Sequence, residues 1–190
     1  MIKSAELLAF HDNGGPVPLS PIWEAIAANH RHNGLLWDQE DLVRRKLAPD
    51  SEIAGNKRAI DLHNQQRNDA IERIDEELLK ALPAPAAGAR LNSETAGAMI
   101  DRLSILSLKI RSMRLQTQRT DVDKEHVEAC RQKLSRLEEQ RKDLAACLDR
   151  LLEEASRGES YFKVYRQFKM YNDPKLNPAI YGETKRPTRS

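Results

Sequence analysis

The stretch from Val127 to Ala155, VEACRQKLSRLEEQRKDLAACLDRLLEEA, decides the fold class because its apolar residues recur every three or four positions. The apolar stripe, interrupted by a single arginine, reads Val127, Cys130, Leu134, Leu137, Arg141, Leu144, Leu148, Leu151 and Ala155. This spacing predicts one long helix that buries one face. No stretch of the chain alternates apolar and polar residues with a period of two, so we predict an all-α fold without a sheet.

Capping and breaking residues divide the chain into four long helices. We predict them from Ser20 to about Leu47, from Asp50 or Ser51 to about Leu82, from Asn92 or Ser93 to about Gln118, and from Thr120 or Asp121 to Gly158. Short connections between helices of similar length favour an antiparallel bundle, with a short helix near Ser4–His11 lying across it. We expect residues 1–157 to form the bundle domain and residues 158–190 an aromatic-basic C-terminal segment, mobile after about residue 181.

Composition and the two cysteines exclude several classes of protein. The 190 residues contain no apolar run of eighteen and begin with no long apolar stretch, so we expect neither a membrane span nor a secretory signal. Cys130 and Cys147 lie about 25 Å apart along one predicted helix, too far for a disulfide. We therefore expect free thiols, a cytoplasmic protein and no thiolate zinc site.

Polar residues occupy positions on the predicted buried faces of at least three helices. They include His30, Asn33, Asp41 and Arg44 on the first long helix, Lys57, Asn64 and Arg67 on the second, and Arg141 on the fourth. The third helix should be the most buried, with Asp101, Arg102 and Lys109 between or beside its apolar stripes. Each unpaired buried polar group costs about 1–3 kcal/mol. Two interpretations stay open: a self-satisfied network that pairs Asp41 with Arg67 or Asp101 with Arg141, or a polar pocket for a small anionic or sugar-like ligand.

Catalytic and metal-binding motifs are weak. The acidic residues Asp61, Asp69, Glu72, Asp75 and Glu76 have a spacing that could hold Mg²⁺, as in all-helical nucleotide pyrophosphatases. They alternate with lysines and arginines, however, which favours a solvated, charge-paired face. His30 and His32 should point apart on a helix, and the chain has no HExxH, P-loop, GxGxxG or GxSxG motif. We predict no metal and no cofactor, and leave open whether the protein is an enzyme.

The C-terminal segment concentrates aromatic and positive residues. From Arg157 to Ser190 it has eight basic and three acidic residues, together with all four tyrosines of the chain. Such a mixture can stack on bases or sugars and contact phosphates. We favour the alternative, a short helix that docks Tyr161, Tyr165 and Phe168 onto the acidic bundle while its cations pair back with the bundle.

Four ordered segments resemble an uncharacterised bacterial family, family 4254 of the domain-of-unknown-function series. They are NHRHNGLLWDQED from Asn29, KRAIDLHNQQRNDAIERID from Lys57, LNSETAGAMIDRLSILSLKI from Leu91 and YRQFKMYNDPKLNP from Tyr165. The resemblance implies a helical protein without an established activity, and, by association with loci for envelope polysaccharide or lipopolysaccharide glycosyltransferases, a role in glycan assembly. The family often has histidine where Asp38 stands and proline where Ala96 stands, so no role of that histidine can be transferred.

The polar core positions and the family segments overlap, which defines the candidate site. The candidate pocket consists of His30, Asn33, Trp37, Glu40, Asp41, Asn64, Arg67, Asn68, Asp69, Asp101, Arg102, Lys109 and Arg141. The candidate contacts of the C-terminal segment are Tyr165, Arg166, Lys169 and Tyr171. We predict an accessory partner of an envelope-glycan enzyme; the alternative is a protein or enzyme that binds a nucleotide-sugar or phosphate. A homo-oligomer stays open, and nucleic acid ranks last as a partner.

Overall fold

Six helices and one pair of short strands make up the computed structural model, which describes residues 2–168, 170 and 173–183. The helices are α1 (Ser4–Asn13), α2 (Pro21–Val43), α3 (Asp50–Ala81), α4 (Ala96–Thr117), α5 (Lys124–Ser156) and α6 (Pro178–Glu183), and the strands are β1 (Arg90–Leu91) and β2 (Ser160–Tyr161). The predicted helical class is confirmed. No helix within the described ranges combines the length and apolar character needed to cross a membrane.

Local sequence explains where the long helices begin and end. Pro21 is the first residue of α2, where its missing N–H costs nothing. Thr95 and Asp123 cap α4 and α5 by accepting hydrogen bonds from the backbone N–H groups of Ala98 (3.1 Å) and His126 (2.6 Å). Both caps lie two or three residues later than predicted. Gly158 follows α5 with a φ of 72°, a conformation that favours glycine and stops the helix as expected.

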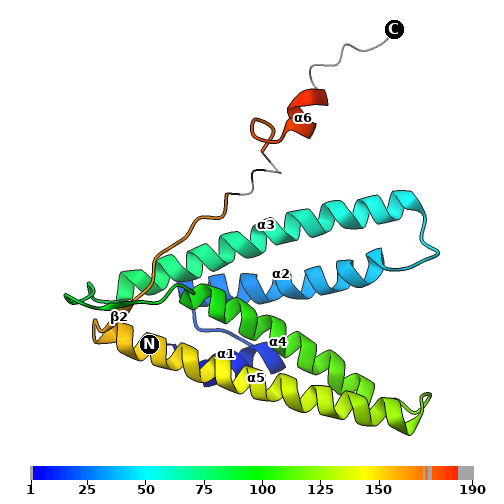
Figure 1. Ribbon diagram of the computed structural model, residues 1–190, viewed down its shortest axis with the longest axis horizontal. Coiled ribbons are helices and arrows are strands. Elements are labelled where there is room, and N and C mark those ends of the chain that lie inside the picture. The colour runs from blue at the N-terminus through cyan, green and yellow to red at the C-terminus, as the bar shows by residue number, and fades with distance from the viewer. Residues whose placement is uncertain (1, 169, 171–172, 184–190) are drawn as a thin grey trace.

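The long helices form two antiparallel hairpins, α2 with α3 and α4 with α5 (Figure 1). Helix α1 packs against α4 and α5. The hairpins meet near the N-terminal part of α4 and separate toward their loop ends (Figure 1). An antiparallel bundle of four helices closed along its length is therefore not confirmed.

The apolar core lies where the two hairpins and α1 meet. Ile26, Ile74, Leu103 and Leu148, one from each long helix, are fully buried there. Helix α4 has the most buried residues of the helices, as the sequence predicted, since it contacts α1, α2, α3 and α5. This core fixes α2 against α4, and the polar site described below lies on these two helices.

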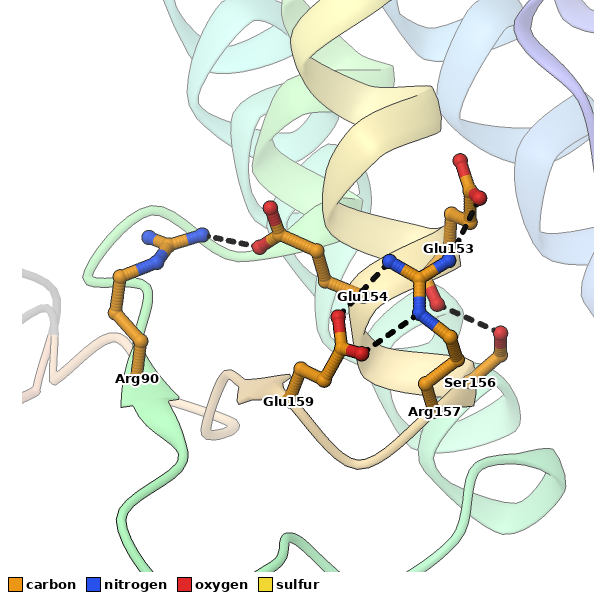
Figure 2. A network of polar contacts seen from close by, with 6 residues as sticks. All are labelled: Arg90, Glu153, Glu154, Ser156, Arg157 and Glu159. Atoms are coloured by element: carbon orange, nitrogen blue, oxygen red, sulfur yellow. Dashed lines mark hydrogen bonds and ion pairs between the residues drawn. The ribbon is translucent and has the colours of Figure 1, made fainter.

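A two-stranded parallel sheet, which the sequence analysis did not predict, joins the α3–α4 linker to the end of α5. Arg90 and Leu91 of β1 pair with Ser160 and Tyr161 of β2. Figure 2 shows the ion pairs around it: Arg90 binds Glu154 at 2.5 Å, and Arg157 binds Glu153 and Glu159 at 2.6 and 2.8 Å. Two residues per strand are too few for a detectable alternation, so periodicity could not reveal this sheet.

The C-terminal segment has no helix from Phe162 to Phe168, so the predicted docking helix is wrong. Phe162, which directly follows β2, is the aromatic side chain of this segment that lies in the core, at 2% exposure. Tyr165 and Phe168 are 53% and 84% exposed. The predicted return of a cation to the acidic helix is confirmed, because Arg166 pairs with Glu72 (2.6 Å) and Glu76 of α3.

Candidate functional site: a groove divided by Trp37

A buried hydrogen-bond network connects the middle of α2 to α4. Asn29 and Asn33 both donate from Nδ2 to Asp101 Oδ1, at 2.8 and 2.9 Å, and Asn33 also donates to Ser104 Oγ at 3.0 Å. His30 Nδ1 lies 2.8 Å from the same Ser104 oxygen. These hydrogen bonds satisfy the buried side chains and fix Asn33 and His30 in position.

His30 is held neutral by its surroundings. Burial lowers its pKa first and the charge of Arg111 second, while Asp12 raises it. The ring stacks on His11 with centroids 4.7 Å apart. Burial first, then the electrostatic coupling of the two imidazoles and the charge of Arg141, lower the pKa of His11 to about 3. Ser104 is 0% exposed, so the Ser104–His30 pair cannot offer its hydroxyl to a substrate as a nucleophile.

Both predicted ion pairs are wrong. Asp101 binds the two asparagines instead of Arg141, and Arg141 reaches Asp12 (2.6 Å) and Ser107 (3.1 Å), because α1 packs beside α5. Arg67 donates to Asn68 Oδ1 at 3.2 Å, and among the described residues it forms no ion pair with Asp41. Asp101 thus belongs to a buried network and Arg141 to partly exposed contacts beside α1, whereas Asp41 and Arg67 line a cavity.

This cavity, of about 370 Å³, lies between α2, α3 and α4. Five of the candidate pocket residues line it, namely Asn33, Trp37, Glu40, Asp41 and Arg67. The rest of the lining consists of Leu36, Arg44, Ile105 and Leu108. A second cavity of about 470 Å³ shares Trp37, Asp41 and Leu108 with the first. Its further lining includes His30, Arg31, Asp38, Arg111 and Ser112. We call the two cavities together the Trp37 groove, because the indole ring belongs to the wall of both.

The groove contains several charged groups without a charged partner. Across the residues that the structure describes, Arg31, Arg111, Asp38 and Asp41 take part in no ion pair. Arg67 Nε is buried and has no hydrogen-bond acceptor among these residues. Guanidinium groups donate and carboxylates accept, so the groove offers both kinds of group to a ligand.

The other candidate pocket residues lie outside the Trp37 groove. Lys109 is exposed and lines a cavity on the α5 side of Trp37. Arg102 is exposed and pairs with Glu94 at 2.6 Å, and Asp69 is exposed and accepts from Gln65. Asn64 is half-buried, and Asn68 is buried and donates to Gln167 Oε1 at 2.8 Å. Of the C-terminal candidates, Tyr165 is exposed and Arg166 pairs with α3, while Lys169 and Tyr171 fall outside the described residues.

One member of the acidic set on α3 is not on a solvated face, contrary to our prediction. Asp75 is 2% exposed and accepts a hydrogen bond from the backbone N–H of Gly97 at 2.6 Å, at the start of α4. Burial raises the pKa of this carboxyl to about 6, against hydrogen bonds from Thr95 and Gly97 that lower it, and Glu72 raises it. The carboxylate holds the first turn of α4 against α3.

The raised pKa of Asp75 predicts a pH-dependent stability. A carboxyl whose pKa is about 6 in the folded state and near 3.9 in the unfolded state stabilises the fold as the pH falls through 6. The lowered pKa of His11 has the opposite effect, since it destabilises the fold as the pH falls. The contribution of Asp75 is therefore isolated by comparing the wild type with Asp75→Asn, a variant that keeps an oxygen acceptor for Gly97. We expect the unfolding free energy of the wild type minus that of the variant to rise by about 2 kcal/mol from pH 7 to pH 4.5 in urea titrations. A constant difference would contradict this prediction.

Several residues of the site were not predicted from the sequence. Asn29 lies one turn before Asn33, so the spacing of the two amides could have revealed it. Ser104 and Arg111 carry no motif, and only the packing of α4 against α2 brings them to His30 and Trp37. Within the described chain no three histidine, cysteine or acidic side chains gather as a metal site would require.

Comparison with known proteins gives a family but no activity. No curated protein and no solved structure matches the chain. A family model described as a protein of unknown function (DUF4254) matches residues 23–164, a range that contains all of α2 after its first two residues, α3 to α5 and all the residues of the Trp37 groove. The chain therefore belongs to the DUF4254 family.

Proposed function

We propose that the Trp37 groove binds a sugar nucleotide or sugar phosphate, and that the protein serves glycan assembly as an accessory to an enzyme that uses this ligand. The observation that carries the proposal is the groove itself: an indole ring between two cavities lined by unpaired arginine and aspartate side chains. Each cavity has a volume within the range that small-molecule sites occupy in proteins.

The chemistry of the lining suits a polyhydroxylated ligand. Sugar hydroxyls both donate and accept hydrogen bonds, and the groove provides Asp38 and Asp41 as acceptors and Arg31, Arg67 and Arg111 as donors. The face of Trp37 gives an apolar surface for the C–H groups of a sugar ring or for a base. The three arginines can also bind a phosphate in a bidentate manner, which a plain sugar site would not need.

The floor of the groove is preorganised. Asn33 and His30 line the two cavities, and the buried network with Asp101 and Ser104 holds both. Since Nδ1 of His30 is hydrogen-bonded to Ser104, Nε2 is the ring nitrogen that can form a hydrogen bond with a ligand. A site with fixed side chains loses less entropy when the ligand binds.

A contact with a partner protein is supported by the C-terminal segment. Tyr165, Phe168, Met170 and Leu176 are 53–84% exposed along it. Exposed aromatic and apolar side chains of this kind are enriched in the cores of protein interfaces. We propose an envelope glycosyltransferase as the partner, on the family association given above, and expect the complex to be cytoplasmic because both cysteines are free thiols.

Calorimetric titration tests the ligand. Sugar nucleotides (UDP-glucose, GDP-mannose), glucose 1-phosphate and inorganic phosphate are titrated into the wild type, Trp37→Ala and Arg67→Ala. We expect one sugar compound to bind and each variant to lower its affinity by roughly tenfold to thirtyfold. Arg58→Ala, which removes an exposed arginine from the same helix, should leave the affinity unchanged.

Two results would contradict the proposal: no binding by any compound of the panel, or equal affinity in the wild type and Trp37→Ala. A folded variant is verified by circular dichroism, since Trp37 is half-buried. A pull-down with the full chain, under conditions that preserve weak complexes, tests the accessory role separately. Failure to retain an envelope glycosyltransferase, or equal retention by the wild type and Phe168→Ser, would contradict that role.

A further inference from the structure

Two histidines face each other across the α2–α3 hairpin, away from the Trp37 groove. The imidazole rings of His32 and His63 have centroids 5.5 Å apart and planes inclined by 31°. Neither residue lines a cavity of the groove, and the proposed function uses neither. His32 is 8% exposed and His63 is half-buried.

The inner histidine has an unsatisfied nitrogen. His32 Nδ1 is buried and has no hydrogen-bond partner among the described residues. Leaving such an atom unpaired in the folded state costs free energy that a bond to a ligand would recover.

The outer histidine is oriented by a neighbour. Gln66 Oε1, one turn further along α3, lies 3.3 Å from His63 Nδ1. An acceptor at this nitrogen selects the tautomer with its proton on Nδ1 and leaves the lone pair on Nε2. A metal-binding histidine commonly donates its second ring N–H to an oxygen in this way.

From these contacts we propose that His32 and His63 form a two-histidine site for a borderline divalent metal ion of the Zn²⁺, Ni²⁺ and Cu²⁺ group. Two imidazoles on one tetrahedral zinc ion, with nitrogens about 2.0–2.1 Å from the metal, have ring centres roughly 5 Å apart, near the separation found here. Imidazole ligands suit these three ions, whereas Mg²⁺ and Ca²⁺ prefer oxygen. Water completes the coordination, since no third histidine, cysteine or acidic group joins the pair in the described chain.

The site would link α2 to α3 near the middle of their hairpin. A metal ion that binds the folded state and not the unfolded state raises the unfolding temperature in a concentration-dependent manner. The two histidines lie thirty-one residues apart in sequence, so a shared metal ion requires the folded hairpin. The metal would therefore stabilise the same helix pair that carries Trp37 and Arg67.

Titration of the untagged full chain with ZnCl₂ and NiSO₄ tests the site, because a polyhistidine tag would itself bind both ions. We expect one metal ion per chain and a raised unfolding temperature, with the affinity lowered roughly tenfold or more in His63→Ala and in His32→Gln. His126→Ala is the matched control, since His126 lies on α5 with Nε2 3.5 Å from Cys130 Sγ, and it should bind as the wild type does.

Three results would overturn the proposal: no binding of either ion at roughly millimolar concentration, unchanged affinity in folded His63→Ala, or loss of binding in His126→Ala. Electron paramagnetic resonance of the Cu²⁺-loaded chain supplies a second readout that does not depend on the buried His32 variant. Hyperfine coupling to two imidazole nitrogens in the wild type and to one in His63→Ala is expected, and an identical spectrum for the two would also overturn the site.

Discussion

Gly97→Ala should lower the free energy of unfolding by about 2–4 kcal/mol, measured by urea denaturation at pH 7. A Cβ atom at this position would lie 2.6 Å from the backbone oxygen of Ile71 and 2.8 Å from Asp75 Oδ1. The nearest atom belongs to the backbone of α3, so the clash cannot be relieved by a change of rotamer. Separation of α4 from α3 would also weaken the hydrogen bond from Gly97 to Asp75.

Gly55→Ala provides the matched control because Gly55 also lies inside a helix. A Cβ atom there meets nothing within 4 Å. Alanine has the higher helix propensity, so this variant should be more stable than the wild type by about 0.5–1 kcal/mol. Stabilisation by both substitutions would contradict the close approach of α4 to α3.

Asp101→Ala should lower the free energy of unfolding by a similar amount, about 2–4 kcal/mol. The substitution removes the acceptor shared by Asn29 and Asn33, and Asn29, at 0% exposure, has no access to water. Asn33 keeps its contact with Ser104, so the main cost falls on the amide of Asn29. Chemical denaturation of the two proteins measures the difference.

Two neighbouring substitutions separate this network from a general effect of mutating α4. Asp101→Asn keeps an oxygen acceptor of the same shape and should retain most of the stability. Arg102→Ala removes only an exposed ion pair with Glu94 and should change the stability by less than about 1 kcal/mol. Equal losses in Asp101→Ala and Arg102→Ala would show that the buried amides do not depend on Asp101.

The helices could be predicted from local sequence because their ends depend on nearby residues. Pro21 and Gly158 act through their own backbone conformation, and the spacing of apolar residues in α5 identifies its buried face without knowledge of its neighbours. The C-terminal segment could not be predicted in this way. Its contacts are with β1, about seventy residues earlier in the chain, and with the acidic pair Glu72 and Glu76 of α3.

The candidate site was predictable as a set of inward polar residues but not as a set of contacts. Asn33, Trp37, Glu40, Asp41 and Arg67 do line one cavity. The partners of Asp101 and Arg141 were assigned wrongly, because charge alone favoured joining them. The packing of α1 beside α5 gives Arg141 a closer acid in Asp12, and α2 presents two amides to Asp101. The burial of Asp75 likewise depends on the close approach that Gly97 permits.

The emission of Trp37 during a sugar-nucleotide titration tests the central claim most directly. The chain has two tryptophans, and Trp23→Phe leaves Trp37 as the single tryptophan that reports on the ligand. Trp23 packs edge-on against Phe10 in the core, and phenylalanine keeps an aromatic ring at that position. We predict a saturable change in Trp37 emission, corrected for ligand absorbance, with the dissociation constant found by calorimetry. In Arg67→Ala the same change should require a ligand concentration roughly tenfold to thirtyfold higher. A sugar nucleotide that binds with no change in Trp37 emission would place the ligand elsewhere and contradict the account.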